Sequence, residues 1–198
     1  MAEEKKPNMT KDEKIQKQYD RLIAARNYHY DNLNKWLMSF YVIIGALFVA
    51  FYTLYSKGAK TDIEITVAVV GYVVSLSAWL SGKGYGYWEN KWMEKIHNFE
   101  KNVLKYKKDM QVYTNEDDED KHDCRYNPTK GANVSTTKVA IFMTGIVTIA
   151  WGFLIMMLCL PITCLTKKVL VAIATSIIAS YILMVIGETL LPSIEKHK

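Results

Sequence analysis

Cysteine is scarce in this 198-residue chain, and its placement excludes two classes of site. The three cysteines, Cys124, Cys159 and Cys164, form neither a CxxC pair nor a zinc-binding spacing. This count and spacing argue against a disulfide framework and against a metal centre. We therefore expect no metal and no cofactor, and we expect Cys159 and Cys164 to act as small apolar fillers.

Proline is also scarce, with four residues in the whole chain and none between Asp12 and Tyr55. Gly45 is the only glycine in that stretch. Because proline breaks helix interiors and glycine weakens them, this stretch can form one continuous helix of about 66 Å. The charged first 35 residues also lack the apolar core of a signal peptide. We expect the first apolar run itself to direct membrane insertion.

Hydrophobic residues make up 50% of the chain, yet its mean hydropathy is only −0.03. The apolar residues must therefore be concentrated in some segments and the charges in others. Four runs, each long enough to span a hydrocarbon core of about 30 Å, contain most of the apolar residues. They are residues 36–55, 63–82, 139–161 and 169–191. The sequence thus predicts an all-α integral membrane protein with two transmembrane hairpins, 36–82 and 139–191.

Lysine and arginine are distributed unevenly around these runs. Eight precede Trp36 and eleven lie in residues 83–138, whereas each hairpin loop has only two lysines. Because cytoplasmic loops carry an excess of basic residues, we predict that both termini and residues 83–138 are cytoplasmic. Acidic residues are mixed through the same segments, so the net charge of +5 does not predict direct nucleic-acid binding.

Two heptad-like seams of large side chains lie outside the apolar runs. The first contains Ile15, Tyr19, Leu22, Arg26, His29, Leu33 and Trp36; the second contains Trp92, Ile96, Phe99, Val103, Tyr106, Met110 and Tyr113. Both seams emerge from the same membrane face and lack another partner. We predict that they pair as an antiparallel coiled stalk in the cytoplasm, with Trp36 near Trp88 and Ile15 toward Tyr113.

The same patterns divide the predicted cytoplasmic part of the chain into four segments. We expect an N-terminal cytoplasmic helix over residues 1–35, continuous with the first span, and a heptad helix over 83–113. Residues 114–138 are first acidic and then rich in turn formers. They lack the glycine and spaced oxygens of a calcium-binding EF-hand loop, so a solvated linker is expected there. Residues 192–198 form a short cytoplasmic tail.

The letters Gly84-Tyr85-Gly86 also end a potassium-channel selectivity filter. A filter needs a preceding Thr-Val and a re-entrant pore helix, but Gly82 and Lys83 stand there instead. Lysine, tyrosine and tryptophan are typical of the headgroup level, so we assign an interfacial junction, made of Lys83, Tyr85, Tyr87 and Trp88. Upstream, a face of small residues is suited to close helix packing: Gly71, Ser75, Ala78 and Gly82.

Three polar residues interrupt otherwise apolar faces. Arg26 and His29 lie one turn apart in the first seam, and Glu188 lies in the fourth apolar run. Polar members of a coiled-coil seam set its register, and an intramembrane carboxylate is a functional candidate by default. Glu188 could instead reach the interface and pair with Lys196. We take Arg26, His29 and Glu188 as pore or gating candidates.

Three stretches carry a resemblance to a known family: RNYHYDNLNKWLMSFYVIIGALFVAFY, GYVVSLSAWLSGKGYGYWENKWMEKIHNFEKNVL and NPTKGANVSTTKV. Over residues 21–139 the chain resembles the RipA-family octameric membrane proteins of bacteria. The resemblance implies a homo-octamer in the bacterial inner membrane with a helical cytoplasmic portion, and it implies no established enzyme activity. In plan the chain is also similar to small membrane accessory proteins of type VI CRISPR systems, one kind of which is an octameric pore.

Three functions are therefore open at the level of sequence. The first is an oligomeric pore that perturbs the membrane in anti-phage defence. The second is a non-conducting scaffold that anchors a cytoplasmic protein or ribonucleoprotein through the stalk. The third is a HEPN-like ribonuclease, suggested by Arg26-Asn27, although His29 follows too closely for the end of that motif.

Overall fold

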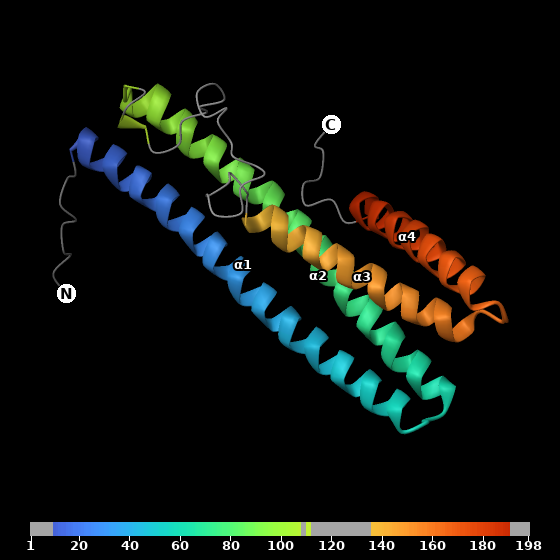
Figure 1. Cartoon of the computed structure of the whole chain (residues 1–198). Coiled ribbons are helices and arrows are strands. Elements are labelled where there is room, and N and C mark those ends of the chain that lie inside the picture. The colour runs from blue at the N-terminus through green and yellow to red at the C-terminus, as the bar shows by residue number, and fades with distance from the viewer. Residues whose placement is uncertain (1–9, 108–109, 112–135, 191–198) are drawn as a thin grey trace, which may run out of the picture. The chain divides into compact units, whose positions relative to one another are not determined.

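The computed structural model describes residues 10–107, 110–111 and 136–190 and contains only helical elements over these ranges (Figure 1). The elements are α1 (Lys11–Ser56), α2 (Thr61–Phe99), the π-helix η1 (Glu100–Leu104), α3 (Thr136–Cys159) and α4 (Leu165–Leu190). Four helices are long and apolar enough to cross a membrane. The predicted all-α class and the four spans are thus confirmed.

Helix α1 has a defined signal at each end. At its start, the Thr10 backbone N–H donates to Glu13 Oε2 at 2.8 Å, and the Glu13 N–H donates to Thr10 Oγ1 at 3.3 Å. This reciprocal capping box satisfies two N–H groups that the helix leaves unpaired. At its end, Gly58 adopts φ 62°, and the Ala59 N–H donates to the Leu54 carbonyl at 3.1 Å. This left-handed glycine cap ends a helix of 46 residues.

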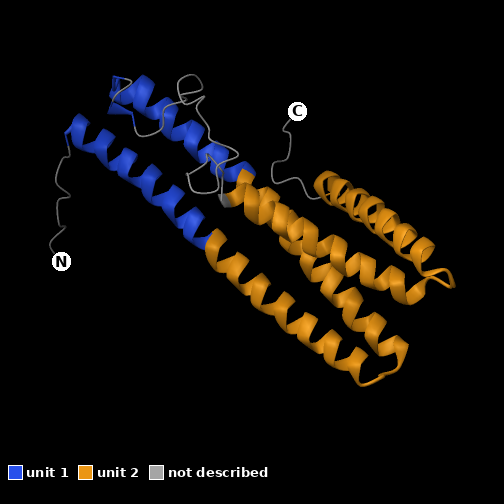
Figure 2. Cartoon of the chain, in the orientation of Figure 1, with its two compact units in different colours: residues 1–32, 87–133 blue, residues 33–86, 134–198 orange. Residues whose placement is uncertain are grey.

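The chain divides into two compact units (Figure 2). The first unit comprises residues 1–32 and 87–133, and the second comprises residues 33–86 and 134–198. The predicted seams fall mostly in the first unit, and the four apolar runs fall in the second.

In the second unit, Trp151 of α3 is fully buried and organises the packing. Its ring stacks on Phe48 at 4.1 Å between centroids and meets Phe51 edge-on at 5.9 Å. It lies against Gly71 of α2, where a Cβ would be 2.6 and 2.7 Å from two of its ring carbons. Aromatic rings in offset or edge contact are favourable, and the glycine allows the close approach.

The small face predicted on α2 is confirmed. Gly71, Ser75, Ala78 and Gly82 are all buried, and Gly82 lies against the Ile141 side chain of α3. Between α3 and α4, Ser176 Oγ donates to the Ile149 carbonyl at 2.7 Å. Small residues and hydroxyls at these contacts let helices approach closely and bond across the interface.

In the first unit, α1 and the end of α2 pack as an antiparallel pair. The Tyr19 ring stacks on Phe99 at 6.2 Å, and the Tyr19 hydroxyl donates to Glu100 Oε1 at 2.5 Å. The register differs from the predicted one. If Trp36 lay beside Trp88, an antiparallel pair would bring Tyr19 next to Lys105. The reason is that Tyr19 lies as many residues before Trp36 as Lys105 lies after Trp88. The observed contact lies more than one helical turn earlier, because Tyr19 is held by Glu100.

The second seam also ends earlier than predicted. A helix was expected through Tyr113, but helical structure stops at Leu104 because Lys105 adopts the left-handed conformation, φ 54°. The Tyr106 N–H then donates back to the Glu100 carbonyl at 3.0 Å and closes the final turn. Lys105 cannot continue a right-handed helix in this conformation. Tyr113, residues 114–135 of the predicted linker 114–138 and the tail 192–198 lie outside the described residues.

The remaining boundaries differ by a few residues. Helix α3 begins at Thr136, before the predicted start of the third run, and α4 begins at Leu165 rather than at residue 169. The expectation that Cys159 and Cys164 are buried fillers is wrong, because both thiols are exposed at the α3–α4 connection.

Candidate functional site

The second unit contains an ion pair between Lys83 of α2 and Glu188 of α4. The Lys83 ammonium also lies 3.5 Å from Met184 Sδ. Close packing beside the pair brings the two helices together, since Leu80 of α2 lies directly against Gly187 of α4. Sequence patterns placed Lys83 at an interfacial junction and offered Lys196 as a partner for Glu188. Lys196 lies outside the described residues, and the partner within them is Lys83.

The pair is only partly shielded from its surroundings. The side chain of Lys83 is 35% exposed and that of Glu188 is 42% exposed. Lys83 directly follows the second apolar run, and Glu188 lies two residues before the end of α4. Ionisable groups in spans characteristically face a bundle interior or water and pair with one another. This pair can therefore meet water while its charges neutralise each other.

Hydroxyl groups inside the second unit serve packing instead. Thr148 Oγ1 donates to the Thr144 carbonyl at 2.8 Å, and both residues are fully buried. Tyr72 and Ser180 share a hydrogen bond of 3.0 Å between α2 and α4. The Tyr72–Ser180 bond links α2 to α4, whereas the Thr148 bond stays within α3. Because the Thr148 and Ser180 hydroxyls are buried and hydrogen-bonded, they do not line a channel through one subunit.

Of the three pore or gating candidates, Arg26 and His29 belong to the first unit and Glu188 to the second. The Arg26 guanidinium lies 5.5 Å from the centre of the Tyr30 ring, and it donates to Asn27 Oδ1 at 3.3 Å. Both contacts are made on its own helix. Arg26 and His29 are half-buried, which suits polar members of a packed seam.

The seam residues divide by exposure. Leu33 and Ile96 are buried, whereas Trp36 is 51% exposed and Val103 is 44% exposed. The other predicted packing residues are half-buried: Ile15, Tyr19, Leu22, Trp92, Phe99 and Tyr106. Leu33 and Ile96 are therefore covered, and the Trp36 and Val103 side chains are left uncovered.

The junction residues lie along one continuous helix, because α2 runs through the predicted interface without a break. Lys83, Tyr85 and Trp88 are half-buried, while Tyr87 is 44% exposed and meets Trp88 edge-on at 5.8 Å. Within the part of the chain that is described, no group of three or more His, Cys, Asp or Glu could hold a metal ion.

Comparison with known families agrees with a chain that contains long apolar helices. The model of the octameric membrane protein family (8xMP) matches residues 16–160. The chain belongs to the octameric membrane protein family. The match extends beyond the predicted resemblance over residues 21–139 to include the third span, and it leaves α4 outside. No curated protein and no solved structure matches the chain.

Membership in this family establishes a homo-oligomeric, multi-pass membrane protein. Glu188 lies in the part that the family match does not cover, whereas Lys83 lies within it. The ion pair therefore joins the family portion of the chain to its additional fourth span.

Proposed function

We propose that this octameric membrane protein forms a conducting ring in the bacterial inner membrane, with both termini in the cytoplasm. The observation that supports it is the half-exposed Lys83–Glu188 pair. In a ring of eight subunits, each subunit would add one such pair at the same height. Rings of charged side chains are a common means of ion selection in channels.

The packed interior of the subunit supports a conducting path between subunits and argues against one through a single subunit. Thr144, Thr148 and Trp151 fill the space between the helices of the second unit and leave those positions dry. A path bordered by several subunits would use their exposed groups instead. Arg26 and His29 would then act at the cytoplasmic entrance, as gating residues and not as part of the same ring.

A pore that opens on a signal would disturb the membrane of an infected cell. This role in anti-phage defence rests on the similarity in plan to the membrane accessories of CRISPR systems. No catalytic role is proposed, because His29 follows Arg26 by only three positions, too closely for the ribonuclease motif.

A second candidate is a non-conducting scaffold for a cytoplasmic protein or ribonucleoprotein. The exposure of Trp36 and Val103 favours it, because large apolar side chains left uncovered on a seam are suited to binding a partner. The two functions differ in one measurable property, which is conduction.

Planar-bilayer recording tests the proposal directly. The purified oligomer should give discrete currents, and Glu188→Gln should change the ratio of cation to anion permeability because it removes one charge per subunit from the ring. Glu94→Gln is the matched control. Glu94 is 60% exposed, pairs with Lys91 and lies outside the apolar run. It should leave the permeability ratio unchanged.

The oligomeric state of each variant is measured in parallel. A folded octamer that never conducts, at any voltage, would overturn the pore and leave the scaffold as the better account. If Glu188→Gln and Glu94→Gln changed the permeability ratio equally, the Lys83–Glu188 ion pair would not border the conducting path.

A further inference from the structure

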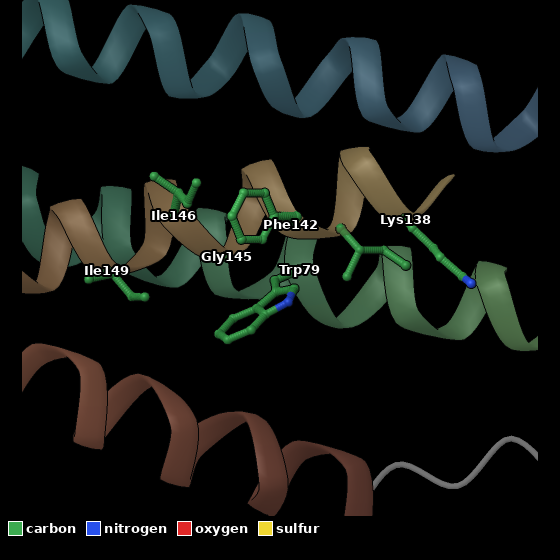
Figure 3. Close-up of a pocket in the computed structure, with 7 residues that line it drawn as sticks. Trp79, Lys138, Phe142, Gly145, Ile146 and Ile149 are labelled. Atoms are coloured by element: carbon green, nitrogen blue, oxygen red, sulfur yellow. The ribbon is translucent and has the colours of Figure 1, made fainter. Parts of the chain in front are cut away.

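Trp79 of α2 and one side of α3 enclose a groove of about 380 Å³ (Figure 3). Its lining is apolar except at one end: Trp79, Lys138, Ile141, Phe142, Gly145, Ile146 and Ile149. The groove is open to the surroundings along α3, where Phe142 is 67% exposed and Ile146 is 45% exposed. It lies wholly within the second unit.

Gly145 determines how the groove forms. A Cβ at this position would lie 3.1 Å from Trp79 Cε2 and 3.2 Å from Cζ2, so the indole rests on the glycine backbone. A larger residue would push the ring away from α3. The groove is therefore a consequence of one small residue on α3 meeting one large residue on α2.

The groove has the depth of one lipid leaflet. Lys138 is the last charged residue before the apolar run that starts at Val139. Ile149 lies eleven residues later, which at ~1.5 Å per residue is ~16 Å, or about half of a ~30 Å hydrocarbon core. The lining thus extends from the headgroup level to the middle of the bilayer and ends there, although α3 continues to Cys159.

We propose that this groove binds one acyl chain of an anionic phospholipid, whose headgroup phosphate lies at Lys138. An apolar channel with a cation at its headgroup end complements such a lipid in both charge and polarity. The start of α3 adds the partial positive charge of a helix N-terminus at the same level. A helix from a second subunit would instead be expected to contact α3 over its whole height, whereas the lining stops half-way.

Native mass spectrometry of the full-length protein in detergent tests the site. Dioleoyl phosphatidylglycerol and dioleoyl phosphatidylcholine have the same acyl chains and differ in headgroup charge. Phosphatidylglycerol should bind about fivefold more tightly, which is the scale expected for one lysine beside an anionic headgroup.

Two variants separate the headgroup from the acyl chain. Lys138→Gln should remove the preference for phosphatidylglycerol and leave binding of phosphatidylcholine unchanged. Ile146→Trp should fill the groove and weaken binding of both lipids. The matched controls are Lys167→Gln, an exposed lysine at the start of α4, and Ile178→Trp, a 58% exposed position on α4. Both controls should bind lipid as the parent protein does.

Two outcomes would contradict the proposed lipid site. Equal binding of the two lipids by the parent protein would overturn the assignment of the headgroup. Loss of the octamer in Ile146→Trp, with lipid binding kept, would show that a second subunit occupies the groove. Either result is independent of whether the protein conducts.

Discussion

Trp151 is the side chain on which the packing of the second unit depends. It is fully buried and contacts aromatic rings from α1 and a glycine from α2. In a bilayer the lipid is as apolar as the side chains, so helices associate through close packing and not through removal of apolar surface from water. A residue of α3 that touches two other helices therefore has a large share in holding the three together.

Substitution of Gly71 tests this contact. Gly71→Ala places a methyl group 2.6–2.7 Å from ring carbons of Trp151, a distance that the buried ring cannot accommodate without moving. The cost should be about 1–3 kcal/mol, as for other overpacked cores. A lower thermal unfolding midpoint in detergent would show it.

Gly45→Ala is the matched control, because no atom lies within 4 Å of the added Cβ. It should leave the midpoint unchanged or raise it slightly, since alanine favours the helix more than glycine does. Identical unfolding midpoints for Gly71→Ala and Gly45→Ala would show that the packing of the second unit does not depend on the contact between Trp151 and Gly71.

Helix α2 ends in a π-turn that brings a carboxylate inward. Glu100 begins the π-helix Glu100–Leu104, is fully buried and accepts the hydrogen bond from Tyr19. A π-turn widens the helix and shifts the side chains that follow it onto a different face. Because Ile96 is buried one turn earlier, the end of α2 places an apolar residue and an anchored carboxylate next to α1.

Tyr19→Phe removes the hydroxyl and keeps the ring that stacks on Phe99. The buried carboxylate of Glu100 would lose a hydrogen bond, at a cost on the order of 1–3 kcal/mol for the pairing of the two helices. Hydrogen exchange should then become faster for the amides of residues 11–32. Amides of residues 33–56, in the second unit, should keep their protection.

Tyr28→Phe is the control, because Tyr28 is 73% exposed and should contribute little. If exchange over residues 11–32 were the same in Tyr19→Phe as in the parent protein, the Tyr19–Glu100 bond would have no part in pairing the helices.

Much of the molecule's apolar surface is left for lipid and for other subunits. In the most apolar window of α1, only 11% of the residues are buried, and the exposed ones include Val42, Val49 and Tyr52. A single subunit therefore does not cover its own first span. This agrees with membership in an octameric family, because neighbouring subunits of a symmetric oligomer can cover such faces.

The orientation of the whole molecule in the membrane is a separate prediction, drawn from the distribution of lysine and arginine. In a chain whose three native cysteines are replaced by serine, Lys57→Cys and Lys167→Cys should react with an impermeant thiol reagent added outside intact cells. Lys101→Cys should react only after the cells are opened. Labelling of Lys101→Cys from outside would show that the orientation is the opposite of the predicted one.

The sequence by itself determined the class of fold and the location of the spans. Runs of about 20 apolar residues match the thickness of a bilayer, and inside a bilayer the backbone must satisfy its own hydrogen bonds, which a helix does locally. The small face of α2 was also visible, because residues three and four positions apart share a face of any helix. Such properties depend only on neighbours along the chain.

The tertiary structure decided the contacts between distant segments. Pairing of Lys83 with Glu188, the contact of Tyr19 with Glu100 and the groove beside Trp79 each require two helices to meet at a particular height. A heptad pattern predicts that two seams pair, but it permits several registers. The Tyr19–Glu100 bond accompanies a register that lies more than a turn from the expected position. The end of helical structure at Leu104 likewise follows from the left-handed conformation of Lys105 and the bond from Tyr106 to Glu100. Neither the register of the seams nor the end of helical structure leaves a periodic signal in the sequence. The register arises from packing between residues that are far apart in the chain, and the helix end arises from one residue's backbone conformation.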